Sequence, residues 1–193
     1  MLRAVSVNLA APGPIGATTP GSIAATTITA SNTITPDPVF GIVGSPTNNN
    51  AQTGSVGEYV SAVALYPGGA ISVSTGTVST ITSITLTAGD WDVQASTNVI
   101  WLSSASYTQV NSGISRSPTS FESQGGSSVV SAGSIHAICS SAGTAPGNGS
   151  FAYGIAPVRV NTSATLTLYL NFFANFSGTT IAAFGTISAR RAR

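Results

Sequence analysis

Charge is the property that this sequence most lacks. Charged residues make up 6% of its 193 residues, lysine is absent, and the formal net charge is +1. An ordinary soluble domain carries about a quarter of its residues as Asp, Glu, Lys and Arg. Few groups are therefore available for acid–base catalysis, and the dense cationic patches that bind nucleic acid or acidic membranes are missing. We expect a non-enzymatic structural or adhesive protein with no nucleic-acid partner and no cofactor.

Cysteine and long apolar segments are also scarce. Cys139 is the single cysteine, so no intrachain disulfide can form, and a secreted disulfide scaffold is excluded. Ser6 and Asn8 interrupt the first apolar run well short of a signal-peptide core. No segment approaches the roughly 20 apolar residues of a membrane span. We therefore expect no membrane insertion, and synthesis in the cytoplasm without secretory export.

Proline separates the beginning of the chain from the rest. Each proline removes a backbone donor and favours extended geometry in the residue before it, so residues 1–38 are predicted to be an extended arm. Residues 39–57 are rich in Gly and Asn and are predicted to be a linker. Residues 58–193 carry the β-patterned segments and are predicted to be one domain. The prolines of the arm are Pro12, Pro14, Pro20, Pro36 and Pro38.

The arm has the pattern of a docking segment. Val5, Val7 and Leu9 alternate with polar residues, as in a strand that adds to the sheet of another protein, and Pro14 and Ile15 extend this candidate docking region. Such a segment cannot by itself offset about 1–2 kcal/mol of backbone entropy per residue, so a partner would have to order it. A disordered terminus with accidental alternation is the alternative.

The domain is predicted to be all-β. Apolar residues occupy every second position in Trp91–Trp101, with one break, and in Ala164–Phe172, which predicts two half-buried core strands. No window has the pattern of a capped amphipathic helix. Many short strands between turn signals indicate an antiparallel sandwich, jelly roll or barrel. Weaker strands are predicted at Tyr59–Tyr66, Ile71–Thr75, Val78–Leu86, Tyr107–Ile114, Val129–Cys139, Phe151–Val160 and Ile181–Ser188.

Two of these strands have apolar or small residues on both faces, namely Tyr59–Tyr66 and Ile181–Ser188. A thin sandwich cannot bury both faces of several strands by itself, so we expect a subunit interface there. The residues predicted to form a homotrimer interface are Tyr59, Val63, Ile181, Phe184 and Ile187.

Two groups of motifs resemble known families. Leu86–Val93, in which a glycine turn leads into an aromatic strand, and the final strand Phe184–Arg191 resemble the jelly-roll knobs of C1q/TNF-like proteins. Pro14–Pro20 and Ala24–Ala30 are similar to segments of bacteriophage tail-fibre and virion-appendage proteins. The resemblance implies a homotrimeric knob with its C-terminal strands near the three-fold axis. The arm has no Gly-X-Y repeat, so a collagen triple helix is not expected.

Asp90 and Asp92 are the main candidates for chemistry. Their spacing along a strand is roughly 7 Å, close to the carboxylate separation of inverting glycosidases. However, Asp90 follows a glycine at a turn, Asp92 is expected to face outward, and no cation is near in the sequence, so nothing there would raise a carboxyl pKa. We therefore predict no catalytic residue. Calcium binding by these carboxylates with nearby oxygen ligands is an alternative.

The other titratable residues give weaker signals. His136 and Cys139 fall on opposite faces of a predicted strand, which makes a catalytic pair unfavourable. One histidine per chain could still form a metal site on a trimer axis, although we predict no metal site. Glu58 and Glu122 have no evident role, and Arg116 and Arg159 are expected to pair with them or to be solvated.

The chain ends in a basic cluster. Arg190, Arg191 and Arg193 are candidates for contact with an anionic surface, and a solvated chain end is the alternative. Exposed aromatic residues near turns suggest a host surface glycan as a further partner.

These features together predict a structural protein on the virion surface of a tailed phage, made in the cytoplasm of the host bacterium. Its partners would be itself, as a homotrimer, and other virion proteins of the capsid, collar or tail. The short arm favours a capsid decoration protein or short head fibre. A receptor-binding tail fibre is the alternative, and a polysaccharide depolymerase is a lesser one.

Overall fold

The computed structural model describes residues 50–121, 143–145, 147, 149–178 and 180–192, all of which belong to a unit formed by residues 48–193. The predicted arm (1–38), including Val5, Val7, Leu9, Pro14 and Ile15, lies outside the described residues. So do the predicted strand at Val129–Cys139 and the residue Arg193.

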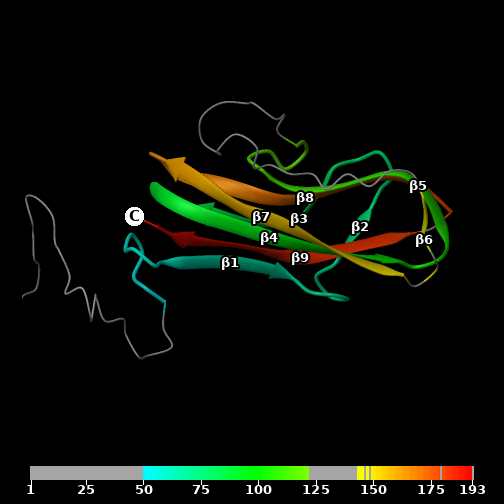
Figure 1. The fold of residues 1–193 in the computed structure, drawn as a ribbon, viewed down its shortest axis with the longest axis horizontal. Helices are drawn as coiled ribbons and strands as arrows, with labels where there is room; N and C mark the ends of the chain where they lie inside the picture. Colours follow the sequence, from blue (N-terminus) through cyan, green and yellow to red (C-terminus); the bar gives the residue numbers. More distant parts are fainter. Residues whose placement is uncertain (1–49, 122–142, 146, 148, 179, 193) are drawn as a thin grey trace, which may run out of the picture. The chain divides into compact units, whose positions relative to one another are not determined.

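The described residues contain strands and no helix (Figure 1). All strand pairings are antiparallel, and they form two sheets, which confirms the all-β prediction and is consistent with a sandwich. The strands are β1 (Tyr59–Ala64), β2 (Ile71–Val73), β3 (Ser79–Leu86), β4 (Gly89–Trp101), β5 (Ala105–Ser115), β6 (Gly143–Ala145), β7 (Ser150–Thr162), β8 (Leu166–Ser177) and β9 (Ile181–Arg191).

The first sheet has the order β1-β9-β4-β7, with β2 also paired to β9, and the second has the order β3-β8-β5-β6. Four of the pairings are nested along the chain. β1 pairs with β9, β3 with β8, β4 with β7, and β5 with β6. The two halves of the chain therefore run back along each other, and most connections cross from one sheet to the other.

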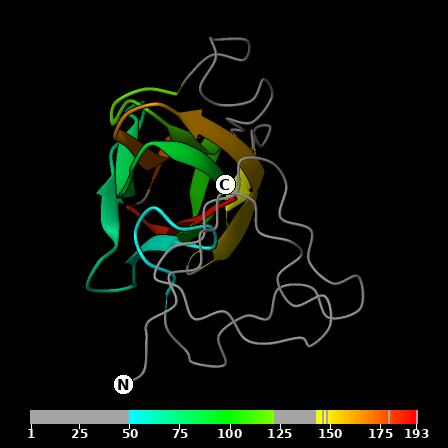
Figure 2. The same cartoon turned by 90° about the vertical axis from the view of Figure 1, so that its left-hand side faces the viewer.

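The core consists of side chains that the two sheets bury between them, and Figure 2 shows the strands end-on. In β4 the odd-numbered residues point inward, and Trp91, Val93, Val99 and Trp101 are at most 1% exposed, as the alternation predicts. A bulge lies between Val93 and Ala95. In β8 the even-numbered residues from Leu168 to Ala174 are buried. The period-2 pattern thus identified the two central strands correctly.

A buried hydrogen bond also joins the sheets. Thr97 of β4 and Ser112 of β5 are fully buried, and their hydroxyl oxygens are 2.6 Å apart. Ser112 Oγ also donates to the backbone carbonyl of Asn171 in β8. Because buried hydroxyl groups are costly unless they are hydrogen-bonded, this contact favours one alignment of the two sheets.

Part of the predicted linker packs against the sheet. The side chain of Asn50 accepts a hydrogen bond from the backbone N–H of Tyr59 and donates one to its carbonyl, with distances of 2.7 and 2.6 Å. The N–H of Gly57 donates to the carbonyl of Arg191. Residues 50–57 therefore form a turn that is attached to β1 and β9.

Candidate functional site

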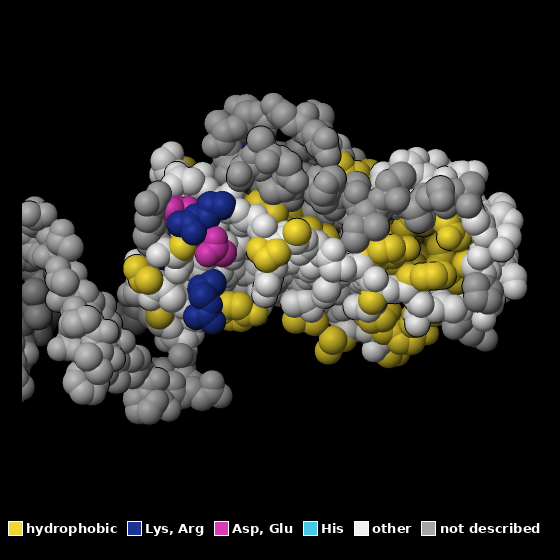
Figure 3. Space-filling model, viewed as in Figure 1, with side chains coloured by type: hydrophobic (Ala, Val, Ile, Leu, Met, Phe, Trp, Pro, Cys, Tyr) yellow, Lys and Arg dark blue, Asp and Glu magenta, His cyan; other side chains and the backbone are white. Residues whose placement is uncertain are grey.

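The outer face of the first sheet carries most of the described charge. Tyr59 lies opposite Arg190, Arg190 opposite Asp92, and Asp92 opposite Arg159, so one row crosses β1, β9, β4 and β7. Figure 3 shows blue and magenta side chains gathered at one end of this face. Successive side chains of a strand point to opposite faces of the sheet. These residues occupy the outward positions, and their neighbours in sequence are mostly buried, so the charged side chains fall on one face.

Arg159 bonds both aspartates of β4. Its Nε and Nη2 donate to the two oxygens of Asp90 at 2.5 and 2.7 Å, and its Nη1 donates to Asp92 Oδ1 at 3.0 Å. These hydrogen bonds, first to Asp90 and then to Asp92, raise the pKa of the Arg159 guanidinium above its usual range. The expectation that Arg159 pairs with a glutamate is wrong, because β7 places it directly beside Asp92; its side chain is also 44% exposed, so it remains partly solvated.

This geometry does not suit a glycosidase. Such an enzyme needs one carboxyl group that holds a proton and a second that is ionised. Here one guanidinium bonds both carboxyl groups, so neither is left free to act separately as an acid or a base. The aspartates therefore form part of an ion-pair cluster with Arg159.

Arg191 has a different environment from its neighbour in sequence. Its side chain is 4% exposed, its Nε donates to Glu58 Oε2 at 3.0 Å, and its guanidinium lies 4.3 Å from the ring centroid of Trp91. It also donates to Thr87 Oγ1 and to the carbonyl of Ala88. Arg191 is therefore not a contact for an anionic surface, which corrects that expectation.

Arg190 is exposed and points to the outer face. Its guanidinium carbon lies 5.7 Å from the ring centroid of Tyr59, which is itself 41% exposed. Among the described residues, Arg190 has no ion pair, whereas all three described carboxylates are bonded to other arginines. Arg190 is thus the described member of the basic cluster that can still contact an anion.

Two adjoining depressions lie on the sheet beside this arginine. Their volumes are about 390 and 350 Å³, and Tyr59, Gln94 and Ser188 line both of them. Asp92, Arg190 and the apolar Pro157 also line the smaller one, and Ser96, Ile155 and Thr186 also line the larger. This face therefore combines an aromatic ring, a guanidinium, an amide and hydroxyl groups.

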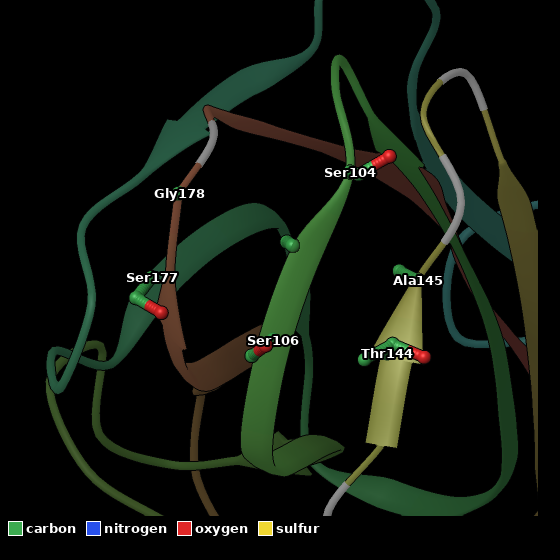
Figure 4. A pocket seen from close by; sticks show the side chains of 7 residues that line it. Ser104, Ser106, Thr144, Ala145, Ser177 and Gly178 are labelled. Atoms are coloured by element: carbon green, nitrogen blue, oxygen red, sulfur yellow. The ribbon is translucent and has the colours of Figure 1, made fainter.

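A second pocket, of about 440 Å³, lies on the other sheet (Figure 4). Ser106 of β5 lies opposite both Thr144 of β6 and Ser177 of β8, so three hydroxyl-bearing residues line up across three strands. Ser104 and Gly178 complete one end. The described lining residues include no charged or aromatic side chain, so this pocket offers less for recognition than the face around Arg190.

The residues of the predicted trimer interface separate into two groups. Ile181 and Ile187 are fully buried in the core of the sandwich, so they cannot contact another subunit, and that part of the prediction is wrong. Phe184 points to the outer face, where its ring lies 5.6 Å from that of Tyr66. Tyr59 and Val63 are 41% and 53% exposed. Tyr59, Val63 and Phe184 are therefore placed where they can contact another molecule.

Exposed apolar side chains concentrate along one edge of the first sheet. Tyr59 and Val63 were predicted as interface residues, whereas Leu65 and Val56, which are 68% and 69% exposed, were not singled out; Tyr66 is 46% exposed. Val63, Leu65 and Tyr66 are called the β1 edge surface: Val63 lies on β1, an edge strand that is paired only with β9, and Leu65 and Tyr66 follow it directly. A signal was present, since Leu65 and Tyr66 end an apolar run just before a Pro-Gly-Gly turn.

Glu122, His136 and Cys139 lie outside the described residues. Within the described ranges, no group of three or more His, Cys, Asp or Glu side chains could hold a metal ion. The same ranges contain no helix with the length and apolar character to cross a membrane.

Comparison with known proteins identifies no relative: no protein-family model matches the sequence, and no curated protein matches it significantly.

The packing of Arg191 predicts a strict requirement for glycine at position 89. Gly89 has a φ of +147°, and a Cβ there would collide with Nη1 of Arg191. We expect Gly89→Ala to displace the guanidinium from Glu58 and to lower the free energy of unfolding by about 3 kcal/mol or more. Urea denaturation followed by tryptophan fluorescence measures this change.

Gly154→Ala is the matched control, because a Cβ at that strand position meets no atom within 4 Å. Its stability should stay within about 0.5 kcal/mol of the parent protein. Equal stability of the two variants would show that Arg191 does not depend on the glycine.

Proposed function

We propose that this chain is a non-enzymatic structural protein of a tailed-phage virion: a trimeric surface knob, docked by its N-terminal arm, in the position of a capsid decoration protein or short head fibre. The β1 edge surface is the observation that carries the proposal. An edge strand with large exposed apolar side chains promotes association. A net charge of +1 gives little repulsion to oppose it.

The strand pairing supports a jelly-roll knob. A jelly roll is a double-sheet form in which eight strands build two Greek keys. With β2 set aside, the eight remaining strands pair first with last, second with seventh, third with sixth and fourth with fifth. That nesting is what results when a long two-stranded ribbon is rolled into two facing sheets.

The β1 edge surface supports contact between copies of the chain. Val63, Leu65 and Tyr66 present apolar groups at the end of β1, and Phe184 continues the patch onto β9. A closed ring of copies would cover this patch on every subunit. The number three comes from the resemblance to C1q/TNF-like knobs in the sequence, and the position of β9 in the sheet next to β1 is compatible with it.

We predict that the purified protein is a trimer at micromolar concentration, as measured by native mass spectrometry. Leu65→Asp should shift it to monomer, because three carboxylates would be buried without partners. Leu102→Asp, at a residue 45% exposed outside the β1 edge surface, is the matched control and should stay trimeric. A parent protein that is a stable monomer would contradict the assembly.

Docking to the virion is assigned to residues 1–38 from their sequence pattern. Deletion of residues 1–36 should leave the β-domain folded, because the strands and core described above lie within residues 58–192. It should abolish incorporation into particles, which quantitative mass spectrometry of purified virions would detect. Particles that carry the truncated protein at normal occupancy would show that the domain itself docks.

A receptor-binding tail fibre is the second candidate function. The observation that favours it is the outer face around Tyr59, where an aromatic ring and unpaired polar groups border two depressions. Such a combination suits recognition of a polar ligand on the host surface. Decoration and attachment use the same fold, and they differ in whether this face contacts the host.

A depolymerase is disfavoured by the Arg159 cluster. We predict that the protein does not shorten capsular polysaccharide or lipopolysaccharide from candidate hosts, and that Asp90→Asn/Asp92→Asn behaves identically. Chain length is measured by size-exclusion chromatography after incubation. Cleavage by the parent protein that is lost in the double variant would establish a glycosidase, since a working acid–base group contributes about 10²–10⁴-fold.

A further inference from the structure

We infer that the outer face of the first sheet binds a saccharide that bears a carboxylate, with Arg190 as the anion contact. This inference deepens the proposed function, since it gives a surface appendage a specific ligand class. The binding surface consists of Tyr59, Gln94, Ser188 and Arg190 and is called the Arg190 face below. These residues come from three neighbouring strands and are partners in the sheet. Tyr59, Gln94 and Arg190 are exposed, whereas Ser188, which lines both depressions, is only 4% exposed.

The polar groups of the Arg190 face are not used by the fold. Within the described residues, the side chains of Gln94 and Ser188 have no hydrogen-bonding partner, and Arg190 contacts the ring of Tyr59 alone. Gln94 lies directly opposite Ser188, and Asp92 opposite Arg190. An amide, a hydroxyl and a guanidinium therefore sit on adjacent strands, about 5–7 Å apart by sheet geometry. This spacing suits the hydroxyl groups and carboxylate of one sugar unit.

Arg190 is also held in a suitable position. A cation–π contact with Tyr59, in which the guanidinium carbon lies 5.7 Å from the ring centroid, restrains the guanidinium, which can still donate its N–H groups to a carboxylate. The exposed part of the Tyr59 ring offers an apolar surface for the C–H groups of a sugar. Restraint of both side chains before binding reduces the entropy lost on binding.

The local charge balance indicates a monoanion. Asp90, Asp92, Arg159 and Arg190 sum to zero, and Arg159 is committed to both aspartates. A ligand near Arg190 therefore meets one unpaired cation, with Asp92 across the strand. A carboxylate carries a single charge and can accept two parallel N–H bonds from one guanidinium, which matches this single unpaired cation.

The two depressions have volumes of about 350 and 390 Å³ and share the lining residues Tyr59, Gln94 and Ser188. Together they provide room for a short oligosaccharide and not only for a single sugar. The larger depression is lined by Ser96 and Thr186, which provide hydroxyl groups. A neutral sugar next to the carboxylated unit would lie there.

The test uses the full-length protein and immobilised polymers of known chemistry. Polygalacturonate, alginate and polysialic acid present carboxylates, and the methyl ester of each is the matched ligand in which that charge is masked. Biolayer interferometry should detect binding to at least one carboxylated polymer and a loss of about tenfold or more on its methyl ester. No binding to any of the three would overturn the inference.

Three variants locate the site. Arg190→Gln and Tyr59→Ser should each weaken binding by about tenfold or more. Arg193→Gln removes the same charge three positions along the chain and should leave binding within about twofold. If Arg193→Gln weakens binding as much as Arg190→Gln does, the polymer is held by non-specific electrostatic attraction, and the assignment of the site to the Arg190 face is wrong.

Native mass spectrometry of the same samples separates this inference from the proposed assembly. If Arg190→Gln and Tyr59→Ser stay trimeric but lose binding, the result supports the Arg190 face as the saccharide site. A parent protein that is monomeric but binds would overturn the trimer and keep the site. If Arg190→Gln or Tyr59→Ser dissociates the trimer, this face is a subunit interface, and the saccharide site is refuted.

Discussion

The ion pair between Glu58 and Arg191 fastens the last strand to the start of the domain. Arg191 stacks on Trp91, bonds the turn before β4 and pairs with Glu58, while Glu58 accepts a hydrogen bond from the N–H of Gly54. Removal of one partner from a buried pair leaves an uncompensated charge, which costs several kcal/mol. The positions of β1, β9 and β4 in the sheet, and hence of the outer face, depend on this contact.

The aspartates on the outer face are also paired with an arginine, and this pairing limits which groups on the surface can bind a ligand. Arg159 bonds both aspartates of β4, so the described carboxylates are all engaged with arginine. The described surface around this cluster carries hydroxyl and amide groups, the apolar side chains of the β1 edge surface, and Arg190 beside Tyr59. Such a surface suits association and adhesion better than acid–base chemistry, in agreement with the proposed structural role.

The sequence predicted the central strands well, because β4 and β8 each bury alternate residues and period 2 is a local signal. The sequence did not reveal ion pairs between residues that are far apart along the chain. Arg159 is 67 residues from Asp92, and Arg191 is 133 residues from Glu58, so nothing local reveals either pair. The apolar residues on both faces of β9 suggested an interface for Ile187, which is instead core. β6 is three residues long and carries no pattern.

The central claim is that the β1 edge surface is covered by another copy of the chain. Hydrogen–deuterium exchange of the backbone amides of residues 61–66, measured from nanomolar to micromolar protein, tests it directly. The account predicts that exchange in this segment slows over the concentration range in which the assembly forms, while β4, which lies between two strands, exchanges slowly throughout. Exchange in this segment that is fast and independent of concentration would contradict the claim.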